Sequence, residues 1–147
     1  MFLISHRGNL VGPKIDYENT IPYIEEALNN SFLCEIDFWY VDGKLFLGHD
    51  TPDHAVSISF LETYKSQLWI HCKNLLALDY LTINHRDFNF FWHQTDDFTL
   101  TSKGFIWTFP NKPTVQKSIL VHLGKPHQDL NIAGISGVCS DFIYFFK

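Results

Sequence analysis

The sequence is poor in cysteine and has no basic run and no long hydrophobic segment. Its three cysteines, Cys34, Cys72 and Cys139, are an odd number and lack the spacing of a zinc site. Cys34 and Cys72 lie inside apolar runs. We therefore expect buried, reduced thiols in a cytoplasmic protein rather than a disulfide framework.

Lysine and arginine are scattered, and the formal net charge is -5. Binding to a phosphate backbone needs a clustered basic face, so no nucleic-acid partner is expected. The first apolar run has only three apolar residues after Met1 before a polar stop, which is too short for a signal segment or a membrane span. No low-complexity linker divides the chain, and 147 residues predict a single domain over 1–147.

Apolar residues make up 46% of the chain and aromatic residues 16%. Eight short runs rich in β-branched and aromatic residues predict strands. They lie at 2–5, 32–41, 44–50, 67–73, 88–94, 104–110, 118–123 and 137–146. Helical spacing follows at 18–30, 56–67 and 73–85, with Thr20 and either Ser57 or Ser59 as N-caps. The first half thus alternates strand and helix, as in a parallel α/β sheet or barrel.

The second half has little room for helices. Its connecting segments 111–118 and 124–134 are short and contain Pro or Gly. A complete (β/α)₈ barrel usually needs about 250 residues and rarely fewer than about 200. The residues alone therefore predict either a trimmed barrel with several helices reduced to loops, or an open sheet.

Two carboxylates lie on one predicted strand. Glu35 and Asp37 project from the same face because side chains alternate along a strand, while Ile36 and Phe38 take the other face. Neighbouring carboxylates repel, and a hard divalent cation compensates them. An exposed acidic edge is the alternative, and the aromatic surroundings make it the weaker one.

Three histidines and a lysine lie at or near the ends of predicted strands. His49 ends the run after Gly48 and has a near-neutral pKa suited to acid-base work, although taken alone it is more typical of a capping or core residue. His71 and Lys73 share a strand face, which is costly unless both face a polar, anionic site. His93 follows another apolar run, and for it the structural and functional interpretations are balanced.

Five short motifs stand in register over roughly the first fifty residues. They are "HRG" at 6–8, "ENT" at 18–20, "EIDF" at 35–38, "DG" at 42–43 and "GHD" at 48–50. Their order and spacing resemble the glycerophosphodiester phosphodiesterase family. "IHCK" at 70–73 is similar to the family's next strand, "WTFPN" at 107–111 to a late tryptophan motif, and "GVCSDF" at 137–142 to the final strand.

The resemblance implies an α/β fold, a TIM-type barrel trimmed in its second half. It also implies an enzyme that hydrolyses phosphodiesters with one divalent cation, commonly Mg²⁺ or Ca²⁺. The implied roles are an acid-base pair (His6 and His49, with His49 as the acid), metal ligands (Glu35 and Asp37), phosphate-facing cations (Arg7 and Lys73) and supporting residues (Glu18, His93 and Trp107). The carboxyl ends of parallel strands meet at one end of a barrel, so His6, Glu35, His49 and His71 are expected to converge there.

His71 stands where the family usually has a third carboxylate. As a third ligand it lowers the negative charge and shifts the site toward Mn²⁺ or Zn²⁺. The short second half predicts a small or exposed phosphodiester substrate. Missing helices would also leave apolar strand faces that a homodimer covers.

Two other functions fit the same residues. One is a non-catalytic module that binds phosphate or glycan, favoured by His71 and the trimmed length. The other is a lyase that stops at a cyclic phosphate product. The presence of both His6 and His49 favours the hydrolase.

Overall fold

The computed structural model describes residues 1–147. It contains ten strands, three short α-helices and one 3₁₀ helix. In chain order these are β1 (Phe2–His6), α1 (Ile21–Asn29), β2 (Leu33–Val41), β3 (Lys44–Leu47), β4 (His54–Ala55), α2 (Ile58–Tyr64), β5 (Leu68–Cys72), α3 (Leu75–Asn84), β6 (Phe90–Trp92), β7 (Phe98–Leu100), β8 (Ile106–Thr108), β9 (Ser118–Val121), β10 (Gly137–Ser140) and η1 (Ile143–Phe146).

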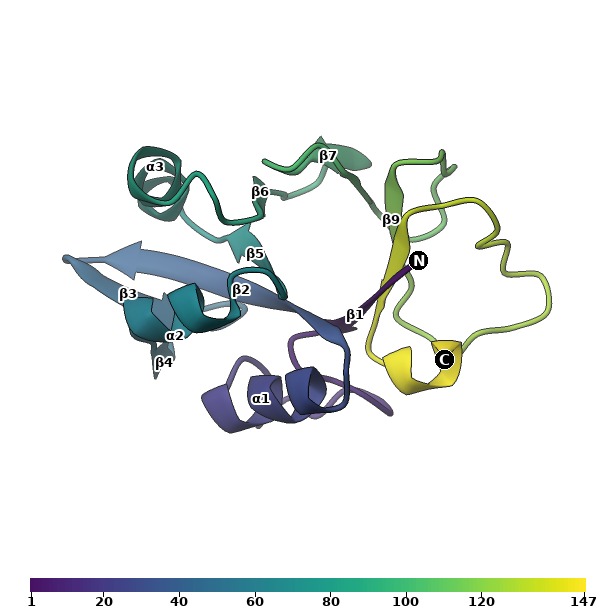
Figure 1. Ribbon diagram of the computed structural model, residues 1–147, viewed down its shortest axis with the longest axis horizontal. Coiled ribbons are helices and arrows are strands. Elements are labelled where there is room, and N and C mark those ends of the chain that lie inside the picture. The colour runs from purple at the N-terminus through teal and green to yellow at the C-terminus, as the bar shows by residue number, and fades with distance from the viewer.

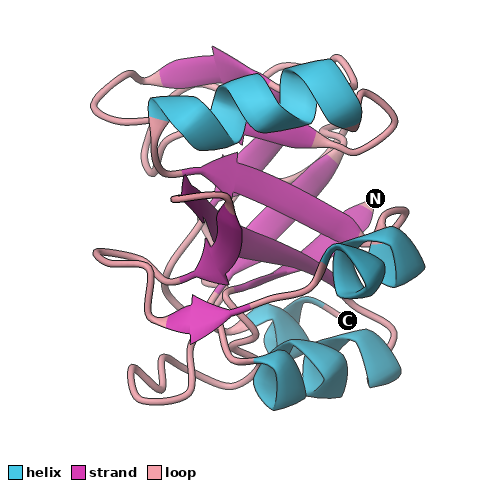
Figure 2. Cartoon of the chain, turned by 90° about the vertical axis from the view of Figure 1, so that its left-hand side faces the viewer, coloured by secondary structure: helices cyan, strands magenta, loops and turns pink.

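The strands form one mixed sheet that curves into a half-barrel (Figure 1). Seven neighbouring strands run parallel in the order β6-β5-β2-β1-β10-β9-β8. Antiparallel pairing adds β7 at the β8 edge, and the hairpin of β3 and β4 extends from β2. No strand pairing joins β6 to β7 or β8, so the sheet does not close. Figure 2 shows the helices packed outside these strands.

The expectation of a TIM-type barrel is wrong. Only three α-helices form, all before residue 85, and strands and helices do not alternate around a closed ring. Segments 109–117 and 122–136 join parallel strands without any helix, as their Pro and Gly content predicts. A chain of this length cannot supply eight strand and helix pairs, so hairpins and loops take the place of the missing crossovers.

The three helices form where the apolar spacing predicts them. Ser57 precedes α2, and its hydroxyl accepts a hydrogen bond from the Phe60 amide at 3.1 Å. Asn74 caps α3 by accepting from the Ala77 amide at 3.0 Å. Thr20 stands at the start of α1 but makes no cap bond, because its hydroxyl donates to the Tyr17 carbonyl instead. None of the helices has the length and apolar character that crossing a membrane requires.

Alternation along the strands divides the buried residues between two faces of the sheet. Outward residues of β2 and β5, such as Ile36 and Ile70, join a core cluster of 15 residues beneath the helices. Inward residues form a second cluster of seven, which includes Ile4, Trp69 and Trp107. All three cysteines are buried and free, as predicted. The second cluster fills the bottom of the half-barrel and leaves the strand ends above it to polar side chains.

Candidate functional site

Polar side chains occupy the inner face directly above this second cluster. His6 lies two residues after Ile4 on β1, and His71 two residues after Trp69 on β5, so each points to the same side as its apolar neighbour. They open into a pocket of about 370 Å³. Its charged wall is lined by His6, Arg7, Glu35, His49, His71 and Lys73. The structure therefore brings together the residues that were expected to converge.

The hairpin of β2 and β3 carries His49 back to the pocket. In its register Phe38 faces Leu47, and the Gly48 amide donates to the Asp37 carbonyl at 3.1 Å. Gly48 has a φ of 152°, and a Cβ at this position would lie 2.0 Å from the Thr51 carbonyl oxygen. Only glycine permits this return, which explains the "GHD" motif in terms of backbone geometry.

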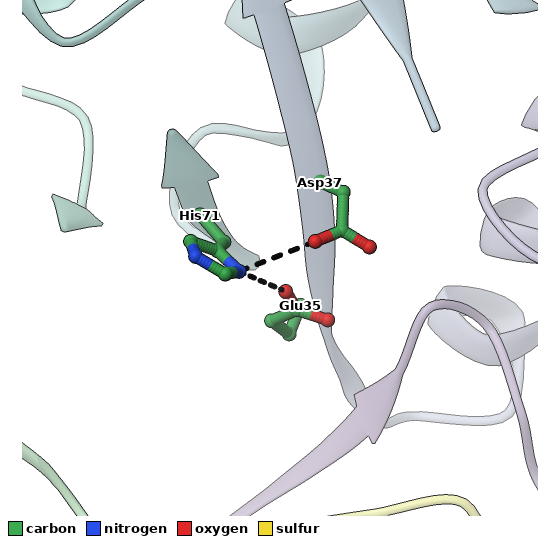
Figure 3. A group of neighbouring side chains, drawn as sticks. All are labelled: Glu35, Asp37 and His71. Carbon is green, nitrogen blue, oxygen red and sulfur yellow. Dashed lines mark ion pairs between the residues drawn. The ribbon is translucent and has the colours of Figure 1, made fainter. Parts of the chain in front are cut away.

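Glu35, Asp37 and His71 form a buried cluster on the pocket floor (Figure 3). His71 Nδ1 lies 3.2 Å from Asp37 Oδ1 and 3.7 Å from Glu35 Oε1. Glu35 is 2% exposed and Asp37 is fully buried. One oxygen of each, Glu35 Oε2 and Asp37 Oδ1, has no hydrogen-bond partner. Buried orphan acceptors of this kind are costly unless something compensates them.

Asp37 is compensated mainly by cations. Arg7 Nε lies 3.0 Å from Asp37 Oδ2 and Lys73 Nζ lies 3.4 Å from Oδ1, although the Arg7 Nε–H is not aligned for a hydrogen bond. The Asn19 amide adds an aligned bond to Oδ2 at 2.9 Å. Burial alone raises the pKa of Asp37, but His71, Arg7 and Lys73 outweigh it and hold the pKa well below its ordinary value. Asp37 is therefore an anion at neutral pH.

Glu35 has a different environment from Asp37. Its only ion-pair partners are histidines, with His6 Nε2 at 3.9 Å and His71 Nδ1 at 3.7 Å. Burial and the charge of Asp37 raise the pKa of Glu35. Glu35 therefore lacks a permanent positive partner, unlike its neighbour on the strand.

His6 is held by a carboxylate from the far end of the chain. Its Nδ1 lies 2.7 Å from Asp141 Oδ1, just beyond β10, which leaves Nε2 to face Glu35. Burial lowers the pKa of His6, but Asp141 and Glu35 outweigh burial and raise the pKa above its ordinary value. The Asp141 carboxylate thereby sets both the orientation and the charge of the ring.

A buried asparagine connects these groups to Glu18. The Asn9 side-chain amide lies 2.8 Å from both Asp141 Oδ1 and Glu18 Oε1, and Glu18 Oε2 accepts from Arg7 at 3.2 Å. Sequence reasoning expected Glu18 to be a supporting residue, in contact with the metal or with Arg7, but gave no role to Asn9, Asn19 or Asp141. The Asn within "ENT" and the Ser-Asp ending of the last strand were the signals for Asn19 and Asp141, whereas Asn9 had none.

The remaining predicted residues lie around the rim. His49 is 43% exposed in its side chain and pairs with Asp50 at 2.7 Å. Partial burial and the charges of Arg7 and Lys73 lower its pKa. His93 accepts a hydrogen bond from His71 Nε2 through its carbonyl at 2.9 Å, which fixes the His71 ring with Nδ1 toward the carboxylates.

Trp107 stands on the opposite side of the pocket. It is buried on β8 and stacks on Phe91, with ring centroids 4.5 Å apart. No supporting contact joins it to the charged cluster. Trp107 is thus a wall of the pocket rather than a partner of the charged residues.

The cluster on the floor fits a divalent cation. Glu35, Asp37 and His71 each offer one ligand atom, and these atoms lie within 4.8 Å of one another. A cation at this position would also compensate the two carboxylate oxygens that have no hydrogen-bond partner, and it would give Glu35 the positive partner that it lacks. Two carboxylates with one imidazole suit Mn²⁺ or Zn²⁺ as well as Mg²⁺.

Comparison with known proteins adds no identification. No protein-family model, no curated protein and no solved structure matches this chain. Functional inference therefore rests on the chemistry of the pocket.

Proposed function

We propose that the protein is a metal-dependent phosphodiester hydrolase that acts on a glycerophosphodiester-like or other small, exposed diester. One observation carries the proposal: two members of the carboxylate and histidine cluster, two side-chain cations and two further histidines line a single pocket, with Asp37 buried behind it. Cleaving an anionic diester requires charge neutralisation, a base and an acid, and this set offers all three.

Arg7 and Lys73 are the groups that would hold the phosphoryl oxygens. Both line the pocket, and both are mostly buried with Asp37 behind them. A guanidinium has five donors; Arg7 Nη1 donates to Glu18, and Nε forms an ion pair with Asp37 without an aligned hydrogen bond. Its other donors remain for a ligand, and the two buried anions fix its plane. A fixed guanidinium loses little freedom when a phosphate binds.

His6 and His49 would transfer the protons. Asp141 holds His6 through Nδ1, so that Nε2 is the ring atom available as a base. His49 lies at the half-exposed rim, where a departing alkoxide reaches water, and it serves as the acid. The raised pKa of His6 and the lowered pKa of His49 in the metal-free chain favour the opposite assignment. The leaving-group experiment below decides between the two.

Glu35, Asp37 and His71 are the residues that would hold the cation. A bound divalent cation supplies Lewis-acid stabilisation of phosphoryl charge. His71 is oriented for this role by its bond to the His93 carbonyl.

The test is hydrolysis of glycerophosphodiesters and of bis-p-nitrophenyl phosphate, with Mg²⁺, Ca²⁺, Mn²⁺ or Zn²⁺ added to the chelator-treated protein. His6→Ala and His49→Ala should each lower turnover of glycerophosphodiesters by about 10²- to 10⁴-fold. p-Nitrophenolate needs little protonation, so the variant that lacks the acid recovers much of its rate on the activated diester. His127→Ala, an exposed histidine outside the pocket, is the matched control.

A second candidate function is a phosphate-binding module without turnover. The pairing of Asp37 with Arg7 and Lys73 favours it, because these cations already neutralise part of the acidic cluster without a metal. No hydrolysis of any diester by the unmutated protein, together with phosphate affinity that Arg7→Ala removes, would establish the module and overturn the hydrolase. Accumulation of a cyclic phosphate, followed by ³¹P NMR, would instead indicate a lyase.

A further inference from the structure

The pocket has a second wall of different chemistry from the first. Its lining beyond residue 90 is apolar except for His93 and Gln94. The apolar members are Trp92, Trp107, Phe109, Pro110, Val121 and Leu123. They come from the ends of β6, β8 and β9 and from the loops after them. Apart from His93, every ionisable residue of the charged wall lies at or before Lys73, so the charged and apolar walls come largely from different parts of the chain.

The apolar wall has a rigid base and an exposed rim. Trp107 is 4% exposed and lies in the inner cluster against Phe91 and Trp69. Phe109 and Leu123 are each 44% exposed. A ligand that covers apolar side chains at the mouth of a pocket binds more favourably, in proportion to the apolar area that is removed from water.

We infer that one alcohol group of the bound diester is compact and apolar, and that it lies against Trp107, Phe109 and Leu123 while the phosphoryl group faces Arg7 and Lys73. This inference rests on the proposed function for the identity of the phosphoryl ligand. A glycerol group in the same place would lose hydrogen bonds to water and would meet only one replacement donor from these three side chains, the indole N–H of Trp107.

The size of the pocket limits the apolar group. A volume of about 370 Å³ is near the lower end for small-molecule sites, and it must also hold the phosphoryl group. A single ring or a short branched alkyl group fits such a space, and it would contact mainly the half-exposed side chains of Phe109 and Leu123, above the small exposed part of Trp107. The substrate class is therefore a phosphodiester in which one alcohol group is about the size of a benzyl group.

The experiment uses two monoanionic phosphonates that the protein cannot cleave at the P–C bond. Methyl benzylphosphonate and methyl methylphosphonate are titrated into the full chain by calorimetry, with indole fluorescence as a second readout. We expect the benzyl compound to bind at least about tenfold more tightly, because its ring is removed from water. Leu123→Ala and Phe109→Ala should each lower this ratio severalfold.

Leu100→Ala is the matched control, because Leu100 is a 68% exposed leucine on β7 that does not line the pocket. It should leave the ratio unchanged. Equal affinity for the two phosphonates, or no binding of either, would overturn the inference. Diester turnover is measured separately: a benzyl preference without any turnover leaves the inference standing and removes the proposed hydrolase, whereas turnover without a benzyl preference does the reverse.

Discussion

In residues 1–85 three α-helices pack behind the strands, whereas in residues 86–147 loops join the strands and one 3₁₀ helix follows the last of them. All 15 residues of the larger core cluster lie between Ile24 and Phe90. The same division runs through the pocket, with charged groups from the first part and apolar groups from the second. Buried charges need partners in fixed positions, and strands packed under helices hold them there. An apolar wall has no such directional requirement, so loops can build it.

Two residues of the second part, Asp141 and His93, break this division. Asp141 comes from the end of β10, yet it orients His6 at 2.7 Å in the charged wall. β1 lies between β2 and β10 in the sheet, which brings the last strand beside the first. The charged wall therefore depends on the second part for this contact and for the His93 carbonyl, which accepts from His71 Nε2 at 2.9 Å.

The largest effect is expected at Asp37. Asp37→Ala should remove divalent-cation binding measured by calorimetry and destabilise the protein by about 3–5 kcal/mol, because Arg7, His71 and Lys73 lose a buried anion that they share. Asp79→Ala, on the exposed side of α3, is the control and should change neither quantity. Full metal affinity in Asp37→Ala, or no affinity in the unmutated protein, would refute the cation site.

A pair of leucines compares the packing of the two parts. Leu61 on α2 is fully buried in the larger cluster, and Leu61→Ala should cost about 2–5 kcal/mol of unfolding free energy. Leu123 lies in a loop and is 44% exposed, so Leu123→Ala should change the free energy of unfolding by no more than about 0.5 kcal/mol. Urea denaturation measures both. A similar loss for the two variants would show that the loops are packed as tightly as the helical part.

Of the two changes to the charged wall, the smaller effect is expected for Asp141→Asn, which keeps the shape of the side chain. A hydrogen bond to a charged group is worth about 1.5–3 kcal/mol, so turnover should fall by about 10- to 100-fold. Burial lowers the pKa of His6 and Asp141 raises it, so removal of the Asp141 charge lowers that pKa. The limb of the pH–rate profile that His6 controls should move to lower pH. A loss of rate with an unmoved limb would show that Asp141 acts through stability alone.

Local features of the site were predictable from sequence because they depend on strand alternation. All eight predicted strand runs contain a strand, and Glu35 and Asp37 share the inner face as expected. The two strands that were missed, β4 and β7, are short and lie at sheet edges, where little burial marks them in the sequence.

The network behind the site was less predictable. Asn9 and Asp141 are separated by 132 residues, and their 2.8 Å hydrogen bond exists only because β1 and β10 pair. Asn19 reaches Asp37 through a backbone φ of 61°, which no periodicity marks. Contacts of this kind depend on strand order, and no local sequence pattern predicts strand order.

The sequence by itself determined where eight of the ten strands and the three α-helices form, and which face of β2 carries the carboxylates. It also determined that segments 109–117 and 122–136 are loops, because propensity, alternation and Pro or Gly content act over neighbouring residues. The tertiary structure alone decided that the sheet stays an open, mixed half-barrel, that Asp141 holds His6, and that an apolar wall faces the charged one. These outcomes follow from the pairing of strands that are distant in the sequence. The favourable free energy of this pairing comes from apolar surface that the strands bury together, so no single segment specifies it.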